Sequence, residues 1–164
     1  MPTINMKELK IIDIQLLNEV SEKAKASPRL RMNYNFHQSL DEKCHRMLNA
    51  LEPGTEIPIH RHPSKDETIV ILEGKAKVFT FNSRGTMDGY LLLDHDGGRY
   101  GVNIPKNTWH TIKCDEPCVL FECKEGPYVP HEEEGVLKMD DVRCKMFKAG
   151  AGALAFFVSH RNIR

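Results

Sequence analysis

The most informative stretch of this sequence runs from Gly54 to Gly74 and reads GTEIPIHRHPSKDETIVILEG. At its centre, His60 and His62 are two positions apart. On a β-strand the side chains of such a pair project from the same face, about 6.6 Å apart along the chain. Two imidazoles placed in this way can bind one metal ion at about 2.1 Å from each nitrogen. The stretch therefore predicts a strand that carries part of a metal site.

Two other residues complete a candidate ligand set. Glu67 follows His62 closely, and His110 ends the segment PKNTWH, which begins at Pro105. Three imidazoles and one carboxylate suit iron, manganese, nickel, zinc or copper, and they leave coordination positions open. We therefore expect one divalent transition metal per chain, bound by His60, His62, Glu67 and His110.

Composition restricts the class of protein. The chain has 164 residues, enough for one domain with a core of its own, and its 23 basic and 23 acidic side chains cancel. No long basic run is present, which argues against nucleic acid as a partner, and no segment is long and apolar enough for a membrane span. The N-terminus lacks the apolar core of a signal peptide, and the 5 cysteines include no CxxC pair. We expect a cytoplasmic protein with reduced thiols.

Hydrophobic periodicity predicts one helix followed by many short strands. Residues 13–26 have helical periodicity, with Asp13 as N-cap and Ser27-Pro28 as the stop. Short alternating runs punctuated by glycine and proline follow over about 29–125. The predicted strands are 29–36, 44–51, 56–60, 67–73, 75–81, 89–94, 100–104, 109–114 and 118–124. This pattern favours a small antiparallel barrel or sandwich in a single domain over 1–164.

The tail over 126–164 is less regular. We expect an exposed loop over 126–135 and a short helix or irregular chain over 136–148. The segment 151–158 is apolar and must pack on something, either the barrel or a second copy in a homodimer.

The spacing of the candidate ligands resembles the two sequence motifs of the cupin superfamily. In the second motif Pro105 and His110 fit, and Asn107 stands where glycine is usual, a mild change because asparagine tolerates a left-handed backbone. The first motif fits without a gap at Gly54, His60, His62, Glu67 and Gly74.

A closer resemblance, over roughly Lys7 to His131, is to the WbuC-type cupin-fold metalloproteins. It rests on the stretches SPRLRMNYN (27–35), LNALEPGT (48–55) and FECKEGPY (121–128). Those proteins occur in bacterial surface-polysaccharide gene clusters. The resemblance implies an all-β, double-stranded β-helix, also called a cupin or jelly-roll barrel, with a metal in its mouth. By association alone, it implies a connection with carbohydrate.

Other residues are candidates for substrate chemistry. Glu122 lies in an alternating run, and because a carboxylate inside a barrel is costly unless paired, it is either outward or a catalytic base. Arg29, Arg31 and Asn33 form either a solvated face or a site for an acidic or nucleotide-linked sugar, since arginine binds phosphate through two hydrogen bonds. Tyr128, near the expected barrel mouth, is a further candidate for substrate binding.

Three functions remain open, and in each of them the protein binds a small molecule. The first is a metal-dependent enzyme on a small polar substrate such as a sugar or sugar-nucleotide, with isomerisation or epimerisation as the reaction and Glu122 as the base. The second is an iron-dependent dioxygenase, since open positions beside histidine ligands can hold substrate and oxygen. The third is a metal-containing module that binds a small ligand without turnover.

Overall fold

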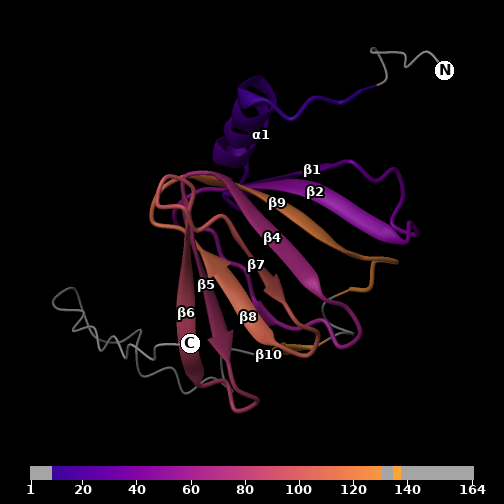
Figure 1. Ribbon diagram of the computed structural model, residues 1–164, viewed down its shortest axis with the longest axis vertical. Coiled ribbons are helices and arrows are strands. Elements are labelled where there is room, and N and C mark those ends of the chain that lie inside the picture. The colour runs from indigo at the N-terminus through magenta and orange to yellow at the C-terminus, as the bar shows by residue number, and fades with distance from the viewer. Residues whose placement is uncertain (1–8, 131–134, 138–164) are drawn as a thin grey trace, which may run out of the picture.

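The computed structural model describes residues 9–130 and 135–137, in which one helix precedes ten strands (Figure 1). No helix in this part of the chain is long and apolar enough to cross a membrane. The elements are α1 (Ile14–Ala26), β1 (Arg31–Asn35), β2 (Cys44–Leu51), β3 (Ile59–His60), β4 (Glu67–Glu73), β5 (Lys75–Phe81), β6 (Met87–Asp94), β7 (Gly101–Ile104), β8 (Trp109–Lys113), β9 (Cys118–Glu125) and β10 (Val136–Leu137).

The described strands form two antiparallel sheets of five strands each. One sheet has the order β1-β2-β9-β4-β7, and the other has the order β10-β3-β8-β5-β6. Strands adjacent in a sheet are often distant in the sequence, as where β9 lies between β2 and β4. This is the all-β double-stranded β-helix with an N-terminal helix that the sequence predicted.

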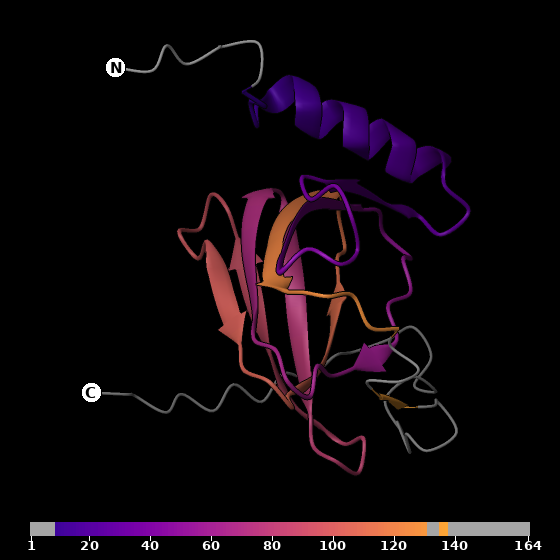
Figure 2. The same ribbon diagram turned by 90° about the vertical axis from the view of Figure 1, so that its right-hand side faces the viewer.

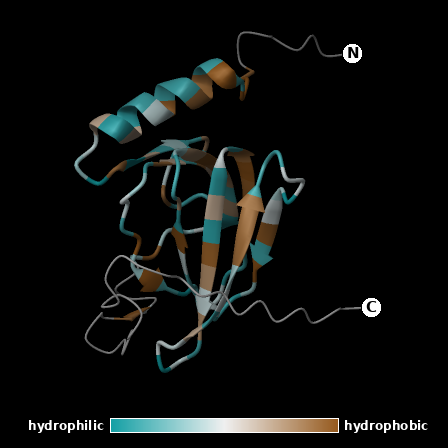
Figure 3. Cartoon of the chain, turned by 90° about the vertical axis from the view of Figure 1, so that its left-hand side faces the viewer, coloured by the Kyte–Doolittle hydropathy of each residue, from teal (hydrophilic) through white to brown (hydrophobic). Residues whose placement is uncertain are grey.

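The main core lies between the two sheets. Alternation along each strand turns every second side chain inward, and Figure 3 shows hydrophobic and hydrophilic segments interspersed along the strands. Ile69, Val78, Leu93 and Leu120 are at most 1 % exposed and belong to this inner cluster. Apolar side chains, most of them aliphatic, thus fill the space between the two sheets.

Helix α1 packs on the outer face of the sheet that begins with β1 (Figure 2). Asp13 caps it, because its side chain accepts a hydrogen bond from the backbone N–H of Leu16 at 3.0 Å. Val20 and Ala24 on its inner side pack against Leu48 of β2. Burial of each large apolar side chain contributes about 1.5–3 kcal/mol, so the apolar stripe holds the helix on the barrel.

Two segments differ from the sequence prediction. The strand expected over 56–60 is confined to Ile59–His60, because Pro58 lacks the N–H that a sheet ladder requires. Val136–Leu137, expected to be helical or irregular, forms β10 and pairs antiparallel with β3. The rest of that tail, with the apolar segment 151–158 and its predicted contact with a second copy, lies outside the described residues.

Candidate metal centre

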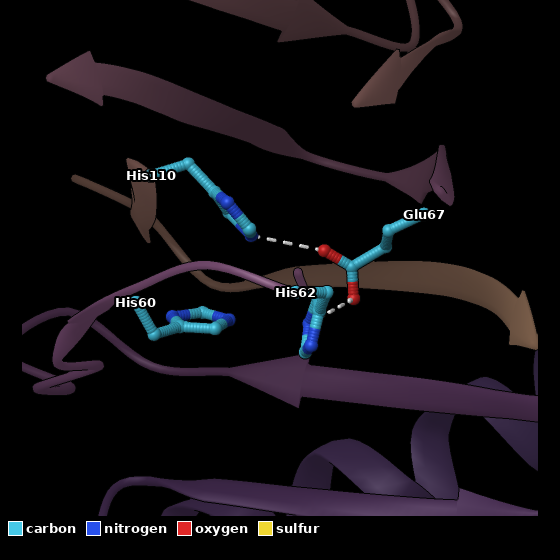
Figure 4. A group of neighbouring side chains, drawn as sticks. All are labelled: His60, His62, Glu67 and His110. Carbon is cyan, nitrogen blue, oxygen red and sulfur yellow. Dashed lines mark hydrogen bonds and ion pairs between the residues drawn. The ribbon is translucent and has the colours of Figure 1, made fainter. Parts of the chain in front are cut away.

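The four predicted ligands meet inside one end of the barrel (Figure 4). His60 on β3 lies directly opposite His110 on β8, so both side chains leave the same face of one sheet. Glu67, the first residue of β4, reaches them from the other sheet, and His62 follows β3. All four side chains are buried, and one donor atom from each lies within 4.8 Å of the others. Segments far apart in the sequence thus form one cluster.

The loop before β8 ties two of these segments together. Asn107 adopts the left-handed conformation that its sequence position predicted, with φ of 65°. Its backbone N–H donates to the carbonyl of His62 at 2.8 Å. The loop that precedes His110 is therefore joined to the segment that carries His62.

Backbone carbonyls orient two of the imidazoles. Nδ1 of His60 lies 2.9 Å from the carbonyl of Pro58, and Nδ1 of His110 lies 2.9 Å from that of Thr108. A carbonyl only accepts, so Nδ1 carries the hydrogen in both rings and Nε2 is left for the cluster. Nε2 of His110 lies 3.0 Å from Glu67, and Nε2 of His62 lies 3.8 Å from the other oxygen of the same carboxylate.

This donor set fits one divalent metal ion. Two ligands on opposite sides of a metal at about 2.1 Å stand about 4.2 Å apart, close to the 4.8 Å spread of the four atoms. Three imidazole nitrogens with one carboxylate oxygen are intermediate between hard and soft ligands, and such a set suits several transition metals. Three histidines and a glutamate, buried together, form a site that can hold a divalent metal, and the donors alone do not select which one.

A second polar group lies beside the cluster on β9. Alternation along this strand sends Leu120 into the core and places Glu122 and Lys124 on the same inner face. Nζ of Lys124 lies 2.7 Å from Glu122 and 3.2 Å from Glu67. Nδ2 of Asn49 donates to the other oxygen of Glu122 at 2.5 Å. Glu122 therefore points inward and is paired. Lys124 contacts both Glu122 and the predicted ligand Glu67.

Sequence reasoning missed Lys124 and Asn49. The signal for Lys124 was present, since it continues the inward alternation through Leu120 and Glu122. Asn49 carried no such signal, because its inward direction follows from the pairing of β2 with β9. Its Oδ1 is buried and has no hydrogen-bond partner within the described residues, which leaves an acceptor on this wall of the barrel.

Burial and charge separate the pKa values of the two carboxyl groups. Burial raises the pKa of Glu122 to about 7, with help from the negative charge of Glu67 and against the opposing charge of Lys124. Burial also acts upward on the pKa of Glu67, but the hydrogen bond from His110 and the charge of Lys124 outweigh it and hold that pKa well below its ordinary value. The metal-free cluster thus favours an ionised Glu67.

The cations beside these carboxylates respond in the opposite direction. Burial alone would lower the pKa of His110, but its hydrogen bond to Glu67 raises the pKa overall. The pKa of Lys124 is likewise raised, because Glu122 and Glu67 outweigh the effect of burial. A metal that takes Nε2 of His110 must displace a proton, so metal binding releases protons in this site.

Arg31, the predicted substrate residue at the start of β1, lies away from this end. Arg31 lies opposite Leu51 of β2. Lys124, beside the cluster, lies opposite His45, which is six residues from Leu51 along the same strand. That offset is roughly 20 Å along an extended strand. Arg31 instead donates to the carbonyl of Glu56 at 2.6 Å. The register of β1 on β2 sets this depth, and a substrate contact by Arg31 stays a prediction.

The other three candidates lie at different depths. Arg29 is exposed and precedes β1, beyond Arg31. Asn33 lies directly opposite Asn49, on the inward side of an outer strand, and contacts the sulfur of Met47 at 3.6 Å. Tyr128 is 45 % exposed near the start of β2. Asn33 and Tyr128 stay candidates for ligand contact, whereas Arg29 does not approach the cluster.

Fold and ligand set together define a cupin-type barrel with a buried His/Glu cluster. The family model described as a domain of unknown function (DUF6016) matches residues 12–93, half of the chain. The chain belongs to this family. No curated protein matches the sequence.

Solved structures with the same fold come from several bacteria. The conserved SPY1581 protein of unknown function from Streptococcus pyogenes is 15% identical, with 77% of this chain and 95% of that chain covered and a TM-score of 0.52. The capsular polysaccharide assembling protein CapF from Staphylococcus aureus is 19% identical, with 68% of this chain covered and a TM-score of 0.51. The match spans only 30% of the CapF chain.

A cupin-2 domain containing protein from Shewanella frigidimarina is 18% identical, with 57% of this chain and 79% of that chain covered and a TM-score of 0.45. At these identities the similarity to SPY1581 and CapF concerns the fold alone.

Proposed function

We propose that this protein binds one divalent transition metal through His60, His62, Glu67 and His110 and uses the site as an enzyme on a small polar substrate. The observation that carries the proposal is the cluster itself, with four buried donors within 4.8 Å and a buried carboxyl group beside it. A structural zinc site is usually closed by four protein ligands in tetrahedral geometry, whereas metals of higher coordination number leave positions for substrate.

The proposed reaction is proton transfer, as in isomerisation or epimerisation. A bound metal would withdraw electrons from a coordinated substrate oxygen and make a neighbouring C–H bond more acidic. Glu122 takes that proton as the C–H bond breaks and returns it to the same or an adjacent carbon. Lys124 and Asn49 each hold one oxygen of Glu122, and the remaining lone pairs can face the substrate.

A carbohydrate substrate, a cytoplasmic location and a homodimer belong to the same proposal. The fold likeness to CapF, a capsular polysaccharide assembling protein, agrees with the WbuC-type resemblance of the sequence. Within the described residues Cys44, Cys114, Cys118 and Cys123 are free, as a reducing compartment favours. Light scattering on the purified chain tests the dimer.

Metal content tests the first part of the proposal. Mass spectrometry of the native protein should find about one transition metal per chain, and His60→Ala with His62→Ala should lose it. His95→Ala is the matched control, because the side chain of this histidine is half exposed and lies 3.1 Å from Asp96, outside the four-residue cluster. A double variant that purifies with the metal load of the parent would contradict the site.

Isotope exchange tests the reaction. Incubation of the metal-loaded protein in deuterated water with a panel of sugars and sugar-nucleotides should place deuterium on one substrate carbon. Glu122→Gln should abolish the exchange and keep the metal, whereas Glu125→Gln, an exposed change on the same strand, should leave both unchanged.

The other two functions predict different results. Oxygen consumption with ferrous iron and no exchange would favour the dioxygenase. Ligand-induced thermal stabilisation without exchange or oxygen consumption would favour a binding module.

A further inference from the structure

The barrel has a hollow where its two sheets end side by side. Strand β6 is the outer strand of one sheet and β7 is the outer strand of the other. Between them lies a cavity of about 350 Å³. Its walls include Val78, Thr80, Gly89, Leu91, Val102 and Ile104. We call this cavity the seam pocket; its volume is at the lower end of the range for small-molecule sites, roughly 300–1,000 Å³.

Strand register connects the seam pocket to the metal ligands. Thr80 lies directly opposite His110, and Gly89 lies directly opposite Thr80. On the other sheet Ile104 lies directly opposite Glu67. Directly opposite residues share a face, and neighbouring strands are about 4.8 Å apart. The pocket therefore begins about one strand away from two of the four ligands.

The walls of the seam pocket are mainly hydrocarbon. Val78, Leu91, Val102 and Ile104 supply apolar side chains, and the acidic Asp88 is its one charged lining residue. No lysine, arginine or histidine lines the cavity, so no cation is present to neutralise a phosphate or a second carboxylate. The pocket thus suits an uncharged hydrocarbon group.

Gly89 keeps this space open. A Cβ built at this position meets no heavy atom within 4 Å, and the backbone is outside the left-handed region that would require glycine. Most glycines of a strand are explained by a close neighbour or a turn. Here the missing side chain instead leaves part of the pocket unfilled.

We propose that the seam pocket binds the hydrocarbon part of a small ligand whose oxygen atoms reach the metal cluster. This inference rests on the proposed metal site, and it narrows the substrate class. The ligand has oxygens on one side and an alkyl, acyl or ring carbon group on the other. Among sugars, deoxy or acylated forms meet this description.

Hydroxamates of increasing chain length test the proposal. They bind a metal through two oxygens, and their tails can extend to the pocket. With the Zn²⁺-loaded protein, calorimetry should show an affinity that rises about threefold for each added methylene from acetohydroxamate to hexanohydroxamate. Gly89→Leu should remove this rise and leave the acetohydroxamate affinity within about twofold, and Gly89→Ala should remove part of it.

Glu73→Leu is the matched control, since it adds the same side chain at an exposed strand end away from the pocket, and it should keep the full rise. An equal rise in Gly89→Leu overturns the proposal, as does a flat series in a parent protein that binds acetohydroxamate. A parent that retains no Zn²⁺ overturns the metal site as well. Melting temperatures of the variants verify that each is folded.

Discussion

The inner face of β9 carries two charged residues where a barrel of this size would ordinarily carry apolar ones. Glu122 is 8 % exposed, and Lys124 has a side chain 14 % exposed. A buried ion pair is weak evidence for stability, since similar apolar residues often do as well. Removal of one partner is costly, however, because the other charge stays buried and unpaired. We therefore expect Glu122 and Lys124 to have a functional role beside the predicted metal site rather than a stabilising one.

The lysine should be the critical member of this pair. Lys124→Met leaves Glu122 buried beside Glu67 without the lysine charge that contacts both, so we expect the free energy of unfolding of the metal-free protein to fall by about 3–5 kcal/mol. Urea unfolding with a chelator present measures it. Glu122→Gln in the same chain should recover part of the loss.

Lys75→Met is the control for this variant. Lys75 forms an ion pair with Asp94 at 3.5 Å, but its side chain is 48 % exposed, so the expected cost is below about 1 kcal/mol. Equal small costs for both lysines would show that the inner pair carries no special energetic role.

At the scale of elements, β2 is joined to the segment that precedes it by two stacked histidines. The rings of His37 and His45 are 4.2 Å apart and nearly parallel. His45 is 2 % exposed, and its Nε2 lies 3.0 Å from the carbonyl of Leu40. Burial lowers the pKa of His45 below its ordinary value of 6.5, and the nearby charges of Lys124 and Lys65 act in the same direction.

This shift predicts acid sensitivity of the segment. The unfolded chain binds a proton at His45 more readily than the folded chain does, so stability falls as the pH drops below about 6.5. In His45→Gln the decline in melting temperature between pH 7.5 and 5.5 should be smaller than in the parent, both measured with a chelator. Identical pH profiles of the two proteins would contradict the role of His45.

At the scale of the whole molecule, the ligand set joins the two sheets. His60 and His110 belong to one sheet, and Glu67 belongs to the other. A metal held by all of them binds only the folded barrel, because the unfolded chain does not bring these segments together. Metal binding and barrel stability are therefore linked.

Metal removal should accordingly lower the melting temperature. At a free metal concentration 1,000 times the Kd, binding contributes about 4 kcal/mol to the free energy of unfolding. Scanning calorimetry before and after chelation measures the shift, and readdition of metal should restore it. The His60→Ala, His62→Ala protein should respond to neither treatment. A parent protein that binds metal without any change in melting temperature would contradict this linkage.

Much of the fold could be predicted because its signals are local. Asp13 caps the helix where its side chain and the following apolar stripe indicated, and β2, β4 and β5 have the bounds that alternation and turn residues predicted. The predicted β3 was too long, since Pro58 interrupts the ladder. β10 could not be predicted, because its two residues become a strand only by pairing with β3.

By itself the sequence determined the class of fold and the identity of the four clustered residues, since residue spacing and strand alternation are properties of the chain alone. Only the tertiary structure decided which residues share a level of the barrel. Register brought Lys124, Asn49 and the seam pocket to the cluster, and it placed Arg31 at the far end of β2. The physical reason is that pairing between distant strands sets depth inside a barrel, and no local pattern encodes that depth.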